Sequence, residues 1–248
     1  MGDGPPLGAS VFTTLRWFDG KVAWLPLHLV RLRAHAERVG IDWPETMLER
    51  LSDLSVEGEG NLCRIRLQRD GEIIVKVRSV DFGDSPLCAV SAVAPRFPKR
   101  VQGTKHANWH PYREARAAAL DAGADLALLV HDGAVVDGDR CTPILLDTDG
   151  VAWAPAAEEG GVDSITLALL APAIEAAGIP FRRGRLTENL IGRARELVVV
   201  STGLGVCYVD EIDGQAVGTD SPGPLFDAAL TAFNALIADA WTALGGEA

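Results

Sequence analysis

The sequence lacks a long hydrophobic run, a cysteine framework and an excess of positive charge. No apolar stretch within its 248 residues approaches the length of a membrane-spanning helix, which needs roughly 20 apolar residues. The first residues carry neither the basic nor the apolar region of a signal peptide. We therefore expect a cytoplasmic protein that does not enter the membrane.

The net charge of −11 argues against a nucleic-acid-binding protein, because such a protein needs a basic face. The cysteines, Cys63, Cys88, Cys141 and Cys207, are dispersed and form no CxxC pair, and the histidines form no HExxH motif. Neither a metal site nor a disulfide framework is indicated. We expect no bound metal and no nucleic-acid partner.

The hydrophobic content of 48% with 23% charged residues is typical of a soluble globular protein, long enough for one large domain or two modest ones. Asp-Gly pairs follow short β-rich runs and predict hairpins. Predicted strands cover residues 10–17, 21–25, 61–67, 72–79, 87–94, 126–131, 134–136, 197–201 and 206–212. Predicted helices cover residues 26–39, 44–54, 111–122, a stretch after 161, 187–195 and 224–241.

The helix that begins at Pro26 carries an apolar stripe at spacings of three and four and should end at Gly40. His28, Arg31 and His35 are predicted to lie on a different face of this helix. The prolines at residues 95 and 98 predict a linker. We therefore expect a mixed α+β chain of two unequal domains, residues 1–98 and 99–248.

Several motifs, in this order, resemble the class IV aminotransferase family, the fold-type IV pyridoxal phosphate enzymes. They are Val11-Phe12-Thr13-Thr14-Leu15-Arg16, His28-Leu29-Val30-Arg31-Leu32, Lys105-His106-Ala107-Asn108, Ser201-Thr202-Gly203 and Ile212-Asp213-Gly214. The resemblance covers nearly the whole chain. It implies a D-amino-acid-aminotransferase-like fold with a small N-terminal α/β domain and a larger C-terminal α/β-barrel-like domain.

The resemblance implies that Lys105 forms the Schiff base with pyridoxal 5'-phosphate. It places Asp137 where the family has a glutamate that contacts the pyridine nitrogen, and it assigns Arg31 to the phosphate. A carboxylate at this position keeps the ring nitrogen protonated and electron-withdrawing. Alternatively, Lys105 is a surface lysine, Asp137 a solvated loop residue and Arg31 a helix-surface arginine.

Phosphate groups bind where helices begin, because unpaired backbone N–H groups and the positive end of the helix dipole meet there. Ser164, Ile165 and Thr166 open a predicted helix and resemble the family's phosphate segment, although Leu167 replaces its usual arginine. Thr202 and Gly203 resemble the second phosphate loop. The alternative for Ser164 is a plain helix cap.

Arg64 and Arg66 lie on one face of a predicted strand because side chains alternate along it. The resemblance places this strand beside the substrate, where two guanidinium groups could bind a carboxylate. An exposed strand face is the alternative. The histidines around Arg31 do not suggest a metal site, because no neighbouring acid completes a ligand set.

The expected function is therefore that of an aminotransferase acting on a small amino acid or keto acid. 4-Amino-4-deoxychorismate lyase, which releases pyruvate, is the alternative favoured by Val11-Phe12-Thr13-Thr14 and Lys105-His106-x-Asn108. Asp137, Leu167 and Thr142, which replaces a family asparagine, suggest a third possibility, a cofactor-free or weakened relative. Trp109 replaces a tyrosine or arginine. The resemblance also implies a homodimer.

Overall fold

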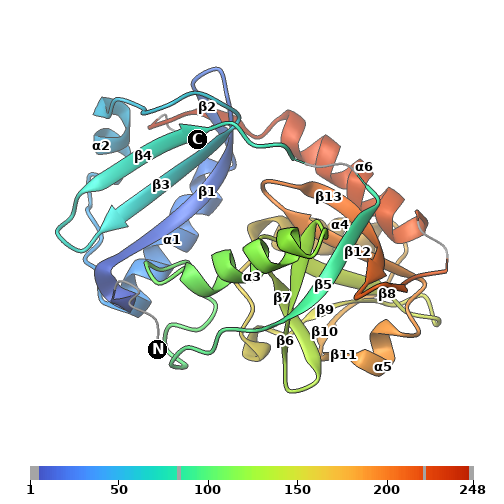
Figure 1. Ribbon diagram of the computed structural model, residues 1–248. Helices are drawn as coiled ribbons and strands as arrows, with labels where there is room; N and C mark the ends of the chain where they lie inside the picture. Colours follow the sequence, from blue (N-terminus) through green and yellow to red (C-terminus); the bar gives the residue numbers. More distant parts are fainter. Residues whose placement is uncertain (1–5, 83–84, 220–221, 246–248) are drawn as a thin grey trace. The chain divides into compact units, whose positions relative to one another are not determined.

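The chain is described by a computed structural model in residues 6–82, 85–219 and 222–245. It divides into two compact units, here called unit 1 and unit 2 (Figure 1). Unit 1 comprises residues 1–81, 97–109 and 235–248, and unit 2 comprises residues 82–96 and 110–234. Each unit is therefore assembled from segments that are separate in the sequence.

Unit 1 is built on a 5-stranded sheet with the order β15-β2-β1-β3-β4. Its strands are β1 (Ser10–Phe18), β2 (Lys21–Ala23), β3 (Leu62–Gln68), β4 (Ile73–Arg78) and β15 (Trp241–Ala243). All neighbouring strands pair antiparallel. Strand β1 is followed by the predicted Asp19-Gly20 turn, in which both residues adopt positive φ angles, as this hairpin type requires.

One face of this sheet packs against helices α1 (Leu25–Val39) and α2 (Met47–Asp53). Alternate strand residues, such as Val11, Leu15 and Ile65, point into the core between sheet and helices. Helix α1 ends at Gly40, whose φ of 73° is the left-handed value typical of a helix C-terminus.

The prediction that His28 and His35 lie away from the buried face of α1 is wrong. Both histidines are fully buried with the apolar stripe. The reason is helical geometry: residue 28 lies three positions after Leu25 and four before Leu32, and residue 35 lies three after Leu32, so all four share one face. The buried face of α1 is broader than its apolar stripe.

Unit 2 is built on a 10-stranded sheet with the order β10-β9-β8-β12-β13-β5-β6-β7-β11, to which β14 adds beside β13. Its strands are β5 (Leu87–Val93), β6 (Leu126–His131), β7 (Ala134–Gly138), β8 (Thr142–Leu146), β9 (Ala152–Pro155), β10 (Phe181–Gly184), β11 (Leu186–Thr187), β12 (Glu196–Ser201), β13 (Gly205–Ile212) and β14 (Gln215–Ala216). The terminal strand β11 returns next to β9, so the sheet is nearly closed and barrel-like.

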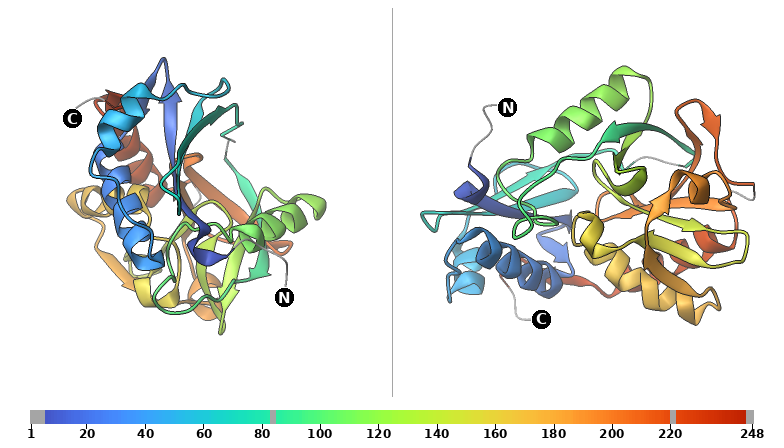
Figure 2. Two further views of the ribbon diagram at one scale, coloured as in Figure 1. Left: turned by 90° about the vertical axis from the view of Figure 1, so that its left-hand side faces the viewer. Right: turned by 90° about the horizontal axis from the view of Figure 1, so that it is seen from below.

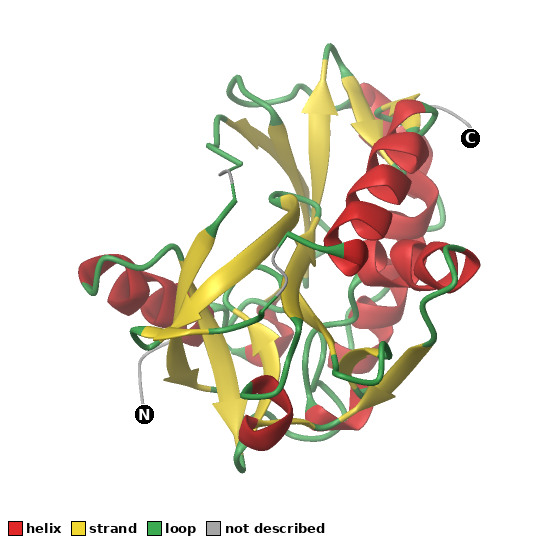
Figure 3. Cartoon of the chain, turned by 90° about the vertical axis from the view of Figure 1, so that its right-hand side faces the viewer, coloured by secondary structure: helices red, strands yellow, loops and turns green. Residues whose placement is uncertain are grey.

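The helices of this part of the chain are α3 (His110–Asp121), α4 (Ile165–Ala176), α5 (Glu188–Ile191) and α6 (Pro224–Ala238). Helix α3 lies against β5 and β6, and α4 against β12 and β10. Figure 2 shows the chain from two further directions in the colours of Figure 1, and Figure 3 distinguishes its helices from its strands. Short 3-10 turns occupy Leu7–Ala9 and Ala157–Glu159. In the described residues, no helix is long and apolar enough to cross a membrane.

The predicted fold class is confirmed, since the chain has a smaller sheet and a larger, barrel-like one. The compact units differ from the expected division at residue 98. Strand β5, expected in the first domain, pairs with β6 and β13 of the larger sheet, and residues 97–109 and 235–248 belong to unit 1. Which strands pair depends on contacts between residues far apart in the sequence, and local periodicity does not specify them. The predicted domain boundary itself stays a prediction.

The beginning of α6 is held by the side chain of Glu196, which is fully buried at the start of β12. Its carboxylate oxygens accept hydrogen bonds from the backbone N–H groups of Gly223, Leu225 and Phe226, at 3.1, 2.9 and 3.0 Å. A negative charge at this point satisfies unpaired N–H donors and complements the helix dipole. Glu196 therefore connects the larger sheet to α6.

We predict that Glu196→Gln lowers the free energy of unfolding by about 2 kcal/mol, because a neutral amide replaces a carboxylate that accepts from backbone donors. Urea denaturation at neutral pH measures this loss. Glu175→Gln, at an exposed position of α4, is the matched control and should change stability little. Equal stability of Glu196→Gln and wild type would contradict this role.

Candidate active site

Lys105 is positioned by a short antiparallel pairing between residues 105–107 and the beginning of β1. The Phe12 N–H donates to the Lys105 carbonyl at 3.0 Å, and the Ala107 N–H donates to the Ser10 carbonyl at 2.8 Å. Val11 and His106 face each other across this pairing. Because side chains alternate along extended backbone, Lys105 points to the opposite face from His106.

The Lys105 ammonium group lies between two aromatic rings. Its Nζ atom is 5.5 Å from the ring centroid of Phe12 and 4.6 Å from that of Trp109. The two rings pack edge to face with their centroids 5.1 Å apart. Cation–π attraction and this packing restrict the long lysine side chain to one region of the sheet face. The Lys105 amine is therefore flanked by two aromatic rings rather than surrounded by solvent on all sides.

The other side of this segment faces the core of unit 1. His106 is fully buried, packs edge to face on Phe97 with centroids 4.5 Å apart, and its ring nitrogens have no hydrogen-bond partner in the described chain. Burial, followed by the nearby His35, lowers the pKa of His106 to about 4. His35 Nδ1 accepts the backbone N–H of Lys105 at 3.2 Å. The backbone of Lys105 is thus held on its core side by the imidazole of His35.

Arg31 lies in the same unit and is held by β1. Its Nη2 donates to the Thr13 hydroxyl at 2.7 Å, and this hydroxyl lies 2.7 Å from His28 Nδ1. Burial, then the charges of Arg31 and Lys105, lower the pKa of His28 well below its ordinary value. The two cations are therefore close enough to act on one imidazole.

Arg64 lies on the sheet face that carries Phe12 and Lys105. Strand β3 places Arg64 opposite Thr14 and Arg66 opposite Phe12, and directly opposed residues share a face. The Arg64 guanidinium carbon is 4.8 Å from the Phe12 ring centroid. The predicted common face of Arg64 and Arg66 is confirmed. Arg66 is the more exposed of the two.

In unit 2, Asp137 is a buried carboxylate near the end of β7, with 3% of its surface exposed. Its Oδ2 accepts the backbone N–H of Val162 at 2.9 Å. The preceding Gly161 makes this approach possible, because a Cβ atom there would lie 2.3 Å from the Val136 carbonyl oxygen. Burial, then the charge of Asp137, raise the pKa of Tyr112 well above its usual value, so this phenol stays protonated beside the carboxylate.

The contact between Asp137 and Val162 brings the acid close to the loop that leads into α4. Ser164 caps α4 by accepting the Leu167 N–H at 3.2 Å, and Ile165 and Thr166 form its first, buried turn. Thr202 and Gly203 lie in the turn between β12 and β13. There the Ser201 hydroxyl accepts the Leu204 N–H at 3.0 Å. The candidate phosphate segments are thus two ordered backbone turns of unit 2.

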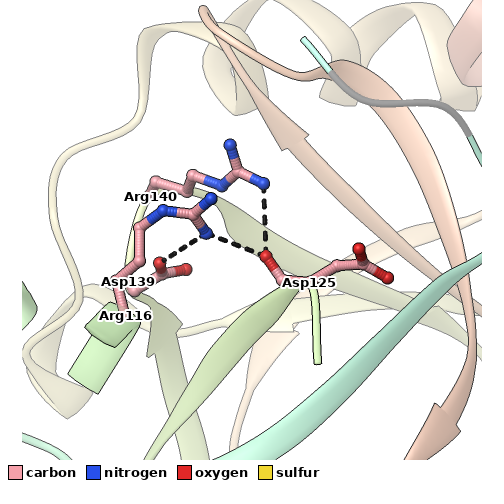
Figure 4. Close-up of polar contacts among 4 residues, drawn as sticks. All are labelled: Arg116, Asp125, Asp139 and Arg140. Atoms are coloured by element: carbon pink, nitrogen blue, oxygen red, sulfur yellow. Dashed lines mark hydrogen bonds and ion pairs between the residues drawn. The ribbon is translucent and has the colours of Figure 1, made fainter. Parts of the chain in front are cut away.

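The turn that follows Asp137 is held by a cluster of charged groups, shown in Figure 4. Arg116 of α3 donates from Nη1 to the Asp139 carboxylate at 3.3 Å and to the Asp125 carbonyl at 2.8 Å. Arg140 donates to the same carbonyl at 3.2 Å. Burial raises the pKa of Asp139 although both arginines lower it. The Arg116–Asp139 pair therefore offsets a costly buried charge two residues after Asp137.

Comparison with known proteins places these observations in a family. The family model of the class IV aminotransferases matches residues 10–212, from the first residue of β1 to the end of β13. The chain belongs to the class IV aminotransferase family. Its members are pyridoxal phosphate-dependent aminotransferases and related lyases, so the predicted family, enzyme class and cofactor are confirmed.

Relatives of this member of the class IV aminotransferase family cover almost its whole length. The D-alanine aminotransferase of Bacillus licheniformis is 24% identical over 247 residues, 90% of this chain and 85% of the relative. The T.th. branched-chain amino acid aminotransferase, solved with pyridoxamine 5'-phosphate, has a TM-score of 0.76 at 20% identity, covering 96% of this chain and 90% of the other. A solved "Putative 4-amino-4-deoxychorismate lyase" has a TM-score of 0.71 at 28% identity, covering 93% and 90%.

Each unit by itself carries groups of the kind that pyridoxal phosphate needs. Unit 1 has an amine and a guanidinium on Lys105 and Arg31, and unit 2 has a buried carboxylate on Asp137 and the N-terminus of α4. The sequence did not predict that the Thr13 hydroxyl contacts both Arg31 and His28. The three-residue spacing of His28 and Arg31 on one helix was the available signal.

We predict that Arg116→Met lowers the free energy of unfolding at pH 7 by about 2 kcal/mol, because the buried Asp139 loses a cationic partner. Arg113→Met, exposed on the same helix, is the control. Because the pKa of Asp139 is raised, its carboxyl favours the folded state while it is protonated at low pH, and this stability is lost as pH rises through that pKa. Arg116 therefore matters most at neutral pH, where Asp139 is ionised. The difference between variant and wild type should therefore shrink in acid. A pH-independent difference in urea denaturation would contradict this explanation.

Proposed function

We propose that the chain is a pyridoxal phosphate-dependent aminotransferase acting on an amino acid, with Lys105 as the lysine that binds the cofactor covalently. The observation that carries this proposal is the placement of Lys105. Its backbone is fixed to β1, and its amine lies between Phe12 and Trp109 on the sheet face that also carries Arg64. The Phe12 ring therefore contacts both an amine that can bind the cofactor covalently and a guanidinium that can bind a carboxylate.

When bound, the cofactor withdraws electrons from the substrate Cα and so makes its proton acidic. We assign Arg31, Ser164, Ile165, Thr166, Thr202 and Gly203 to its phosphate. Asp137 is assigned to the ring nitrogen. With one carboxylate oxygen committed to Val162, its position is fixed by the backbone, which supports a role that needs an oriented charge.

In this proposal Lys105 is also the general base and acid, since its Nζ takes the proton from Cα and returns it. Arg64 and Arg66 bind the carboxylate of the substrate. Arg64 has the stronger support, because the guanidinium stacks on the ring that also supports Lys105. A fixed guanidinium orients a carboxylate better than a mobile one, which favours Arg64 over the exposed Arg66.

We predict that borohydride reduction of the protein saturated with pyridoxal phosphate yields a phosphopyridoxyl adduct on Lys105, identified by peptide mass analysis. Lys105→Ala should lose the adduct and at least about a thousandfold in amino-transfer rate, since it removes both the covalent anchor and the base. Lys99→Ala, at an exposed lysine of the same unit, should retain both. An adduct on another lysine would reject Lys105 as the anchor. The absence of any adduct would reject the proposal and favour a cofactor-free relative.

We predict that Asp137→Asn still binds the cofactor but loses roughly a hundredfold in the rate of Cα proton removal, because the amide cannot supply the negative charge. Asp137→Glu, the residue that the family resemblance leads us to expect, should stay active. Asp132→Asn, in the exposed turn before β7, is the control. Stopped-flow measurement with a Cα-deuterated amino acid isolates this step. Wild-type rates in Asp137→Asn would show that this carboxylate does not serve the ring.

A second candidate is 4-amino-4-deoxychorismate lyase. It is supported by Thr13-Thr14 and Lys105-His106-x-Asn108, and by the 28% identity to the solved protein with that name. The same lysine would act as the proton carrier. The difference lies in the product, because a lyase releases pyruvate without an acceptor.

Two assays separate these candidates. An aminotransferase should convert D- or L-amino acids only when a keto acid is present, whereas a lyase should release pyruvate from 4-amino-4-deoxychorismate alone. Lys105→Ala serves as the blank in both assays. We predict keto-acid-dependent turnover, and acceptor-independent pyruvate release would replace the first proposal with the second. The homodimer and the cytoplasmic location stay predictions.

A further inference from the structure

Thr13, His28 and Arg31 form a polar cluster at the contact between β1 and α1. The Thr13 hydroxyl is the shared atom, 2.7 Å from His28 Nδ1 and 2.7 Å from Arg31 Nη2. Thr13 and His28 are fully buried. Burying polar groups costs free energy unless they form hydrogen bonds with one another, so the arrangement of these three side chains is narrowly constrained.

Two periodicities produce this cluster. Alternation along β1 turns Thr13 toward the core with Val11 and Leu15, whereas Phe12 and Thr14 face the other way. The three-residue spacing of His28 and Arg31 puts both on the α1 face that meets β1. A hydroxyl therefore occupies a core position that a β-branched apolar residue would otherwise fill.

The hydrogen bonds restrict the role of each group. A guanidinium is only a donor, so Arg31 occupies a lone pair of the Thr13 oxygen. Burial and two neighbouring cations keep His28 neutral, and a neutral ring can accept the Thr13 hydroxyl proton on Nδ1. In the tautomer with the proton on Nε2, Thr13 donates to His28 and accepts from Arg31 at once. This series of hydrogen bonds orients a lone pair of the Thr13 oxygen, and the lone pair in turn orients the Arg31 guanidinium.

We infer that Thr13 and His28 are positioning residues that hold the Arg31 guanidinium in place for the phosphate of the cofactor. The inference rests on the proposed function, which assigns Arg31 to that phosphate. Neither residue needs to touch the cofactor. Arg31 is half-buried and carries a flexible side chain, so fixing it beforehand reduces the entropy lost on binding.

The test compares two ligands, pyridoxal 5'-phosphate and pyridoxal, which has the same aldehyde but no phosphate. Thr13→Val keeps the shape and removes the hydroxyl. It should weaken binding of the phosphorylated ligand about tenfold, the typical effect of losing a hydrogen bond to a charged group. Pyridoxal affinity should stay within about twofold, because it does not use Arg31. Thr13→Ser, which keeps the hydroxyl, should restore most of the affinity.

A double-mutant cycle tests whether Thr13 acts through Arg31. Arg31→Met should reduce phosphate-dependent affinity, and adding Thr13→Val should then change it little. Thr46→Val, the same substitution at an exposed threonine of unit 1 without a side-chain cap bond, is the control. Additive effects, or an equal loss of affinity for both ligands, would overturn the inference.

His28 gives an independent pair of variants if Thr13→Val does not fold. His28→Asn keeps a hydrogen-bonding atom near the Nδ1 position and should preserve the preference for the phosphorylated ligand, whereas His28→Leu should reduce it. Equal preferences in both variants would overturn the inference. If the proposed function were wrong, the result would differ, because the wild-type protein would bind neither pyridoxal 5'-phosphate nor pyridoxal at Lys105. That result would also remove the basis of this inference.

Discussion

The short antiparallel pairing between residues 105–107 and the beginning of β1 is the constraint on which the candidate site depends. It adds two backbone hydrogen bonds to the small sheet and thereby assigns each side chain to a face. His106 enters the core, and Lys105 reaches Phe12 and Trp109. A shift of one residue would exchange them, placing an ammonium group in the core and an imidazole at the site.

The two faces of β1 carry different parts of the proposed chemistry. Thr13 faces α1 and orders the guanidinium assigned to the phosphate, whereas Phe12 supports the amine and the guanidinium assigned to the substrate. Because successive side chains point in opposite directions, two neighbouring residues of one strand serve two functions. The hydrogen bond to Arg31 gives a reason for a threonine at a fully buried core position.

Unit 2 contributes rigidity of another kind. Asp137 is tied to the backbone of Val162, the following turn is held by Arg116 and Asp139, and Glu196 anchors α6. Each is a buried carboxylate whose charge is offset by oriented N–H donors of the protein. The candidate acid thus lies in a part of the chain where charged groups have little freedom to move, as an electrostatic role requires.

The sequence alone determined the mixed fold, the hairpin turns, the end of α1 at Gly40 and the family, because turn residues, periodicity and motif order are local signals. It also identified the common face of Arg64 and Arg66 through strand alternation. Only the tertiary structure decided that β5 joins the larger sheet, that His28 and His35 are buried, and that Thr13 holds Arg31. These features depend on which elements meet across long sequence distances, and strand pairing and helix packing leave no signature within one segment.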